Sequence, residues 1–301
     1  MAVPVPDATT LTPGPPPLPP LLAGGRRLRA QRAGRWLRLW VPAAVVILVL
    51  AICFLLPLVI TLPSSTNGNI LQAGDPPFSP GHWLGTDAVG VDIFSQLVYG
   101  GRVAFEVSLA VTGIGLVAGG LLGVAAGYFG GWADAILSRL LDILIAFPAL
   151  VLALAIAEGL GPNEFHEILA LCVFSIPSFG RLTRGATLVI RDHPYMVAAR
   201  LSGTRGWRVI ARHVLPNIMP GIVTFSLLGV GLLIILDGAL DYLGWGIQPP
   251  TASWGNMIYN GYQVMTAQPE YVLIPSIVLV IVVVALNLLG DELRVRWGGQ
   301  Q

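Results

Sequence analysis

Long apolar runs separated by shorter polar stretches dominate the pattern of this sequence. The first run is 22 residues long, from Val41 to Leu62, and contains no charged residue. A helix needs about 20 apolar residues to cross a bilayer, so this run predicts a transmembrane helix. A secretory signal does not fit, because its apolar region is usually about 7–15 residues long and ends at a small-residue cleavage site.

Four further segments follow the same rule and a fifth is shorter, so with the charge argument given below the sequence predicts an all-α, polytopic membrane protein with six transmembrane helices. These segments are residues 109–129, 136–157, 168–180, 218–236 and 271–289. The segment at 168–180 is the weakest, because it is short, contains Pro177 and is followed by Arg181 and Arg184.

Composition and charge agree with a membrane protein. Hydrophobic residues make up 54% of the chain and charged residues 11%, whereas soluble domains carry roughly 25% charge. All 17 basic residues are arginine. If all six segments cross and both termini are cytoplasmic, only Arg102 lies outside, which is what the positive-inside rule favours. Without the fourth crossing, 10 arginines would lie outside, so we expect that segment to cross.

This topology divides the chain into a cytoplasmic tail rich in Pro and Arg (1–40), a first transmembrane helix (41–62), an extracytoplasmic loop (63–101) and a permease core of five helices (102–296). The core includes a cytoplasmic loop at 190–217. Arginines and tryptophans before residue 41 predict contact with lipid headgroups, and nucleic-acid binding is not expected. Cys53 and Cys172 lie in separate apolar runs, so we expect neither a disulfide nor a metal site.

Four glycines repeat at every fourth position of the second segment. Gly115, Gly119, Gly123 and Gly127 therefore share one helix face, and small residues at this spacing allow close helix packing in lipid. Packing within the chain is the expected role, and packing against a second membrane subunit is the alternative. A phosphate-binding loop is not indicated, because no Gly-Lys-Ser/Thr signature is present.

No arrangement of residues typical of catalysis occurs, so we expect a protein that is not an enzyme. The histidines form no metalloprotease pattern, and no serine lies in a nucleophile elbow. Acidic residues at membrane depth are functional suspects by default. Glu106, Asp142, Glu158 and Asp237 all fall near the ends of predicted spans, where headgroup contact or interhelical pairing explains them.

The loop between the fourth and fifth segments has the clearest local pattern. Pro194 suits a helix start, and Gly203 suits a helix end in the left-handed conformation. A second short helix carrying Trp207 should follow, and Pro216 should break the chain before the next span. Two short helices with exposed apolar and Arg side chains suit docking to a cytosolic partner or binding to anionic lipid.

The motifs of this loop resemble those of a known family. The pattern Ala198-Ala199-x-x-x-Gly203, followed by His213-x-Leu215-Pro216, resembles the EAA loop of permease subunits of binding-protein-dependent ABC importers; Val197 stands where that loop usually begins with Glu. Two further blocks are similar to the second permease of dipeptide, oligopeptide and nickel importers. They contain Gly85, Thr86, Asp87, Gly90 and Asp92 before the second helix, and Pro249, Pro250, Trp254 and Gly255 after the fifth.

The resemblance covers residues 36–296 and implies a type I ABC importer permease fold. Val91 and Gln96 depart from the family, which usually has Arg at both positions. The implied partners are a homologous permease, cytosolic ABC ATPases and an extracytoplasmic substrate-binding protein, with ATP and Mg²⁺ held by the ATPases and no cofactor here. The implied ATPase-coupling residues are Tyr195, Val197, Ala198, Ala199, Arg200, Gly203, Arg205, His213, Leu215 and Pro216.

The implied function is peptide import across a bacterial cell membrane. Nickel chelates or another small solute are alternative cargoes of the same family. An ion-coupled secondary transporter is a further alternative, but it should show internal repeats and ionisable groups near the membrane midplane.

Overall fold

The structure is a computed structural model that describes residues 24–298, with side chains from residue 38 to residue 297. The Pro-rich part of the predicted tail, residues 1–23, lies outside the described residues. The chain divides into two units, residues 1–37 and 38–301. In the first unit, the described part is helical from Gly24 onward. The second unit contains all the candidate transmembrane segments.

Every regular element in the described part of the chain is a helix, which confirms the predicted all-α class. The elements are α1 (Gly24–Phe54), α2 (Leu56–Val59), the 3-10 turn η1 (Ile70–Gln72), α3 (Ile93–Ile114), the π-helical turn η2 (Gly115–Gly119), α4 (Gly120–Phe129), α5 (Gly131–Ile145), α6 (Ala149–Leu160), α7 (Glu164–Arg191), α8 (Pro194–Leu201), α9 (Gly206–Val209), the π-helical turn η3 (Ile210–Val214), α10 (Leu215–Tyr242), α11 (Trp254–Gln263) and α12 (Glu270–Gly298).

Five helical segments between residues 38 and 297 are long and apolar enough to cross a membrane. They are Arg38–Val59, Ile93–Phe129, Glu164–Arg191, Gly206–Tyr242 and Glu270–Trp297. A sixth span exists only if α5 and α6 count together, because they are bent by 84° at the break between them. A single helix over 136–157 was therefore a wrong prediction. Pro148 explains the break, since proline disfavours the helical conformation of the residue before it.

Two spans are longer than predicted because their charges are paired. The second begins at Ile93, where the Asp92 carboxylate accepts the backbone N–H of Ser95 at 2.7 Å and caps α3. It continues through Arg102, whose guanidinium lies 2.8 Å from the Glu106 carboxylate one turn away. The fourth span runs unbroken through Arg181 and Arg184, which pair with acids of α5. The predicted segment stopped at Gly180, before these arginines, but the helix continues through them to Arg191.

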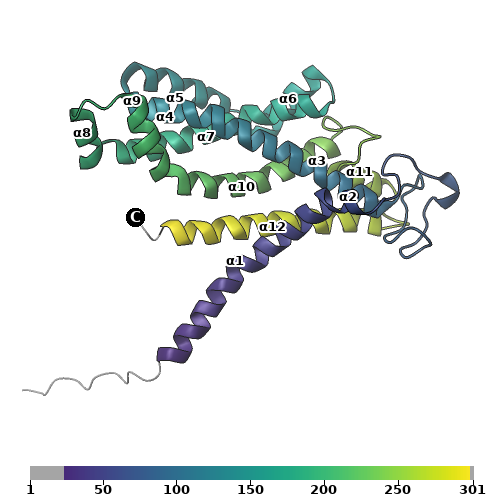
Figure 1. Cartoon of the computed structure of the whole chain (residues 1–301). Helices are drawn as coiled ribbons and strands as arrows, with labels where there is room; N and C mark the ends of the chain where they lie inside the picture. The colour runs from purple at the N-terminus through teal and green to yellow at the C-terminus, as the bar shows by residue number, and fades with distance from the viewer. Residues whose placement is uncertain (1–23, 299–301) are drawn as a thin grey trace, which may run out of the picture. The chain divides into compact units, whose positions relative to one another are not determined.

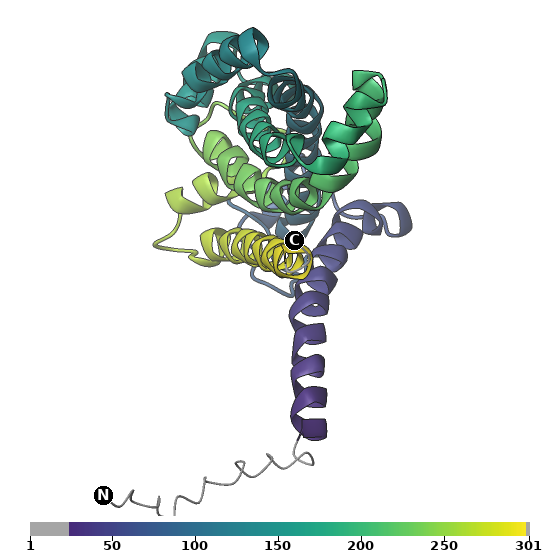
Figure 2. The same ribbon diagram turned by 90° about the vertical axis from the view of Figure 1, so that its left-hand side faces the viewer.

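Helix α7 lies at the centre of the bundle and packs against α3, α4, α5, α6 and α10. Helix α10 lies between α7 and α12, which Figure 2 shows in a view along the bundle. The loop after α2 and helix α11 lie at one end of the bundle, and α8 and α9 lie at the other (Figure 1). The long loop between α2 and α3 and the two short helices α8 and α9 therefore lie at opposite ends of the bundle.

Candidate functional site

The predicted coupling loop forms a compact helical turn at one end of the bundle (Figure 1). Pro194 lies in the first turn of α8, as predicted, and the helix ends at Leu201. Gly203 has a φ of 77°, which is the predicted left-handed conformation. The backbone N–H of Thr204 then returns to the carbonyl oxygen of Ala199 at 3.3 Å, so the turn uses carbonyls that the helix end leaves free.

The loop is fixed to the bundle by buried apolar side chains. Met196, Val209 and Val214 are fully buried. They share a core cluster with Val124 of α4 and Phe179 of α7. The loop is therefore packed directly against α4, α7 and α10.

The opposite side of the loop presents large apolar side chains to its surroundings. Val197, Leu201 and Trp207 are 41%, 83% and 62% exposed. Exposed apolar side chains at this end are compatible with the predicted docking role of the loop. The other predicted coupling residues divide by burial: Tyr195, Ala198, Arg200, Gly203, Arg205 and Pro216 are exposed, and Ala199, His213 and Leu215 are half-buried.

One prediction about this loop was wrong. Pro216 does not break the chain, because α9, η3 and α10 form one continuous helical segment from Gly206 to Tyr242. Pro216 lies in the first turn of α10, directly after the wider π-helical turn η3. The Asn217 side-chain amide donates to the carbonyl oxygen of His213 at 2.6 Å, so a carbonyl beside the proline remains paired.

The glycine stripe lies against α7 of the same chain. A Cβ at Gly115, Gly119, Gly123 or Gly127 would lie under 3.0 Å from atoms of α7. At Gly119 and Gly123 those atoms include backbone carbonyl oxygens of Ile176 and Gly180, which no side-chain rotation can move. The stripe therefore brings the backbones of η2–α4 and α7 into direct contact.

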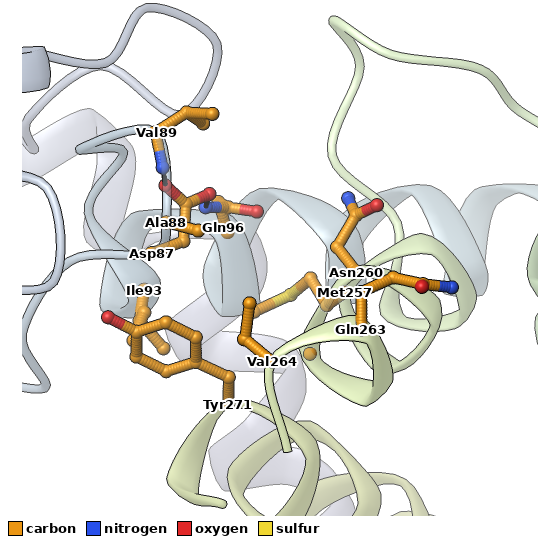
Figure 3. A pocket seen from close by; sticks show the side chains of 11 residues that line it. Asp87, Ala88, Val89, Ile93, Gln96, Met257, Asn260, Gln263, Val264 and Tyr271 are labelled. Atoms are coloured by element: carbon orange, nitrogen blue, oxygen red, sulfur yellow. Dashed lines mark hydrogen bonds between the residues drawn. The ribbon is translucent and has the colours of Figure 1, made fainter. Parts of the chain in front are cut away.

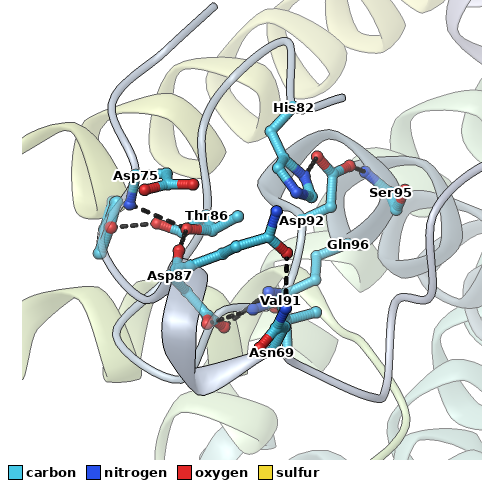
Figure 4. A network of polar contacts seen from close by, with 11 residues as sticks. Asn69, Asp75, His82, Thr86, Asp87, Val91, Asp92, Ser95 and Gln96 are labelled. Carbon is cyan, nitrogen blue, oxygen red and sulfur yellow. Dashed lines mark hydrogen bonds and ion pairs between the residues drawn. The ribbon is translucent and has the colours of Figure 1, made fainter. Parts of the chain in front are cut away.

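Side chains of the first family motif form hydrogen bonds that hold together the loop before α3 (Figure 4). The Asp87 carboxylate accepts the backbone N–H groups of Val89 and Val91 at 3.0 and 2.8 Å, and the Gln96 side chain at 2.7 Å. Asp92 caps α3, and its Oδ1 also forms a hydrogen bond with Nδ1 of the His82 ring at 2.8 Å. Each carboxylate accepts hydrogen bonds from several residues of the loop and of α3, and these bonds hold the loop in place.

Backbone conformation and close packing account for the remaining residues of that motif. Gly85 and Gly90 have φ of 81° and 80°, a region that favours glycine. Thr86 is fully buried, and its hydroxyl donates to the Gln72 carbonyl oxygen while accepting the backbone N–H of Asp75 at 3.0 Å. The Tyr271 hydroxyl of α12 donates to the Thr86 carbonyl oxygen, which ties this loop to the last helix.

The second family motif closes the same end of the bundle. The buried Trp254 indole donates to the Leu97 carbonyl oxygen of α3 at 3.0 Å. A Cβ at Gly255 would lie under 3.0 Å from the Gly238 carbonyl oxygen, so α11 and α10 touch there through their backbones. Pro249 and Pro250, joined by a cis peptide bond, lead the chain from α10 toward α11.

A cavity of about 250 Å³ opens between these two motifs (Figure 3). Its polar lining residues are Asp87, Gln96, Asn260, Gln263 and Tyr271. Its apolar walls come from Ala88 and Val89 before α3, Ile93 of α3, Met257 of α11 and Val264 directly after α11. The cavity joins elements far apart in sequence, and its mixed lining suits a polar group of a partner or ligand.

The acids at membrane depth differ in their surroundings. Glu106 pairs with Arg102, and Asp142 pairs with Arg181 at 2.9 Å. Asp237 is only 2% exposed, which excludes headgroup contact and leaves the other predicted role, contact with a neighbouring helix. It lies with Glu167 and Asp241, two residues that sequence reasoning missed. The four-residue spacing of Asp237 and Asp241 on one helix face was the signal available for the second of them.

A bundle of five or six long apolar helices among the described residues, with a loop of two short helices packed onto one end, defines a multi-pass membrane protein. Residues 119–295 match the family described as "Binding-protein-dependent transport system inner membrane component", and the chain belongs to this family. The predicted family is thereby confirmed. The chain is a membrane permease subunit of a transport system that works with a substrate-binding protein and an ATPase.

Relatives of known name cover most of the chain. The glutathione transport system permease protein GsiD of Pectobacterium atrosepticum is 40% identical over 216 residues, 72% of each chain. The dipeptide transport system permease protein DppC of Alkalihalophilus pseudofirmus is 40% identical over 214 residues, 71% of this chain and 70% of that one. The probable D,D-dipeptide transport system permease protein DdpC of Escherichia coli is 36% identical over 252 residues, 84% of each.

Solved structures support the fold. The MetNI methionine ABC transporter in an inward-facing conformation matches with a TM-score of 0.55 and 20% identity, over 67% of this chain and 97% of that chain. The likeness confirms the predicted type I permease fold.

Proposed function

We propose that this chain is the permease subunit of an ATP-driven importer of short peptides. It forms the translocation pathway together with a second, homologous permease. The observation that carries the proposal is the exposed apolar surface of Val197, Leu201 and Trp207 on a loop that is anchored in the core. The names of the relatives, which are dipeptide and glutathione permeases, support short peptides as the cargo.

In this proposal the loop docks into a groove on a cytosolic ABC ATPase. Closure of the ATPases pushes α8 and α9, and the packed contacts of Met196, Val209 and Val214 pass the displacement to α4, α7 and α10. The contacts must differ between two states for ATP binding to shift the equilibrium. The chain itself is not an enzyme: ATP and Mg²⁺ are held by the ATPases, and this subunit needs no cofactor.

The proposed orientation follows from the arginines. The loop of α8 and α9 and both termini face the cytoplasm, and the end with α11 faces outward, toward the substrate-binding protein. Arg205 is exposed on the inner end, where acidic groups of the ATPase or lipid headgroups would contact it, and Arg200, also exposed, donates to the Arg191 carbonyl oxygen of its own chain.

The test replaces one exposed side chain at each end. Leu201→Asp places a charge on the docking surface, and Leu71→Asp places the same charge on a side chain that is 94% exposed at the other end. In the coexpressed importer, Leu201→Asp should abolish copurification of the ATPases and uptake of a labelled dipeptide. Leu71→Asp should leave ATPase copurification normal. Normal ATPase copurification and dipeptide uptake with Leu201→Asp would overturn the docking role. A wild-type importer that takes up another solute but no dipeptide would overturn the proposed cargo.

A further inference from the structure

Three buried carboxylates meet where α7 begins and α10 ends. Glu167 is fully buried, and Asp237 and Asp241 are 2% and 1% exposed. One oxygen from each lies within 4.8 Å of the others. Asp237 and Asp241 are one turn apart on α10, and Glu167 reaches them from α7.

The carboxylate oxygens are poorly supplied with donors. Both oxygens of Glu167, one of Asp237 and one of Asp241 are buried without a hydrogen-bond partner. The remaining Asp241 oxygen accepts the backbone N–H of Ile247 at 2.6 Å. None of the three takes part in an ion pair among the residues described, and the next charged group along α7 is another acid, Glu164.

Local electrostatics make this arrangement unfavourable without a positive charge. Like charges four residues apart on a helix repel each other, and acids near a helix C-terminus oppose the helix dipole. Burial raises the cost, because water no longer screens the charges. Glu167 adds a third acidic group from a different helix, with two unpaired oxygens of which one lies close to the pair on α10.

The turn after α10 is shaped to fit over these oxygens. A Cβ at Gly246 would lie under 3.0 Å from carboxylate oxygens of both Asp241 and Glu167. Glycine therefore lets the backbone lie directly against the carboxylates, and the next residue, Ile247, donates its N–H to Asp241. The same turn leads to the motif of Trp254, so the cluster supports the packing of α11.

We propose that Glu167, Asp237 and Asp241 bind one calcium ion. Three carboxylates carry up to three negative charges, so a divalent ion offsets them better than a monovalent one. Calcium is bound in proteins by carboxylate and backbone oxygens, and one oxygen from each of the three side chains lies near enough to the others to be offered to a single ion. Magnesium fits less well, because it is usually held by one or two carboxylates and keeps several water molecules, whereas three carboxylates converge here.

The bound ion joins the start of α7, the end of α10 and the turn at 243–247. It thereby fixes the end of the bundle opposite α8 and α9. The inference is independent of the proposed peptide cargo, because ion binding is measured without any substrate.

The experiment uses the detergent-purified importer complex, stripped with EDTA and free of nucleotide. Equilibrium dialysis with radioactive calcium should give one more bound Ca²⁺ per wild-type permease than per Asp241→Asn or Glu167→Gln permease. Calcium should raise the melting temperature of wild type by several degrees and leave both variants unchanged. Asp142→Asn, which removes an exposed acid outside the cluster, should respond like wild type.

The amide variants also test folding. With the charge repulsion reduced, they should melt in EDTA at a temperature equal to or above that of wild type. Equal calcium binding by wild type and variants, or a wild type that calcium does not stabilise, would overturn the proposal. If calcium does not change the melting temperature of wild type but raising the pH lowers it, protons shared between the carboxylates stabilise the cluster instead.

Discussion

The guanidinium of Arg184 on α7 donates two parallel hydrogen bonds to the carboxylate of Asp134 on α5, from Nε to Oδ1 at 2.5 Å and from Nη2 to Oδ2 at 2.8 Å. Both side chains are largely covered, at 32% and 22% exposure. Two-point pairing of this kind is stronger than a single contact and fixes direction. It explains how α7 carries an arginine past the end of the predicted fourth span, and it holds the bent α5–α6 segment against the bundle.

Breaking this pair should destabilise the protein more than breaking the exposed pair beside it. Asp134→Ala leaves Arg184 partly buried without its partner, so we expect a loss of about 1–3 kcal/mol in the free energy of unfolding. Asp142→Ala removes the partner of Arg181, where both side chains are more than half exposed, and should cost less than about 1 kcal/mol. Thermal unfolding of the purified complex gives both values. Equal losses in the two variants would contradict the distinction.

The glycine stripe predicts a steep dependence on side-chain size. Gly123→Ala places a methyl group against the Gly180 carbonyl oxygen and the Thr183 hydroxyl, so α4 and α7 must separate. We expect a loss of about 1–3 kcal/mol or a failure to accumulate folded protein. Gly113→Ala is the matched control, because a Cβ there meets nothing within 4 Å. Fluorescence-detected chromatography of the two variants would reveal the difference; similar folded yields would exclude close packing at Gly123.

Much of this architecture follows from the sequence, and the failures have physical causes. Apolar run lengths predicted most of the spans but not the bend between α5 and α6, and Gly203 predicted the turn after α8, because lipid thickness and left-handed backbone conformation act locally. The start of α3 was missed since Arg102 and Glu106 neutralise each other inside the helix. Glu167 was missed because its partners lie about 70 residues away in the sequence, and only the packing of α7 on α10 brings them together.

Membrane orientation can be tested by thiol labelling. In a background lacking Cys53 and Cys172, a cysteine at the exposed Ser64 should react with an impermeant maleimide added to intact cells. A cysteine at the exposed Ser202, between α8 and α9, should react only after the membrane is opened, because the arginines near it favour the cytoplasm. Labelling of Ser202→Cys in intact cells would invert the proposed topology.

The turn at Gly203 offers the most specific test of coupling. Its φ of 77° disfavours any side chain, and a β-branched one most, at a cost on the order of 1–2 kcal/mol. A Cβ there meets nothing within 4 Å, so the effect of Gly203→Val is conformational and not a clash. The variant should redirect α8 relative to α9 while the spans insert normally.

We therefore expect Gly203→Val to be present at wild-type abundance but to bind the ATPases weakly, or to let them hydrolyse ATP without uptake. Gly203→Asn is the matched control, because asparagine tolerates the left-handed region better than valine, and it should retain most activity. Charge reversal at Arg200 or Arg205 should give a milder loss of ATPase binding. If the loop contacts only lipid, ATPase copurification will be normal in all of these variants. Measuring copurification and dipeptide uptake side by side separates the two cases, because only a docking loop links the conformation of Gly203 to ATPase binding.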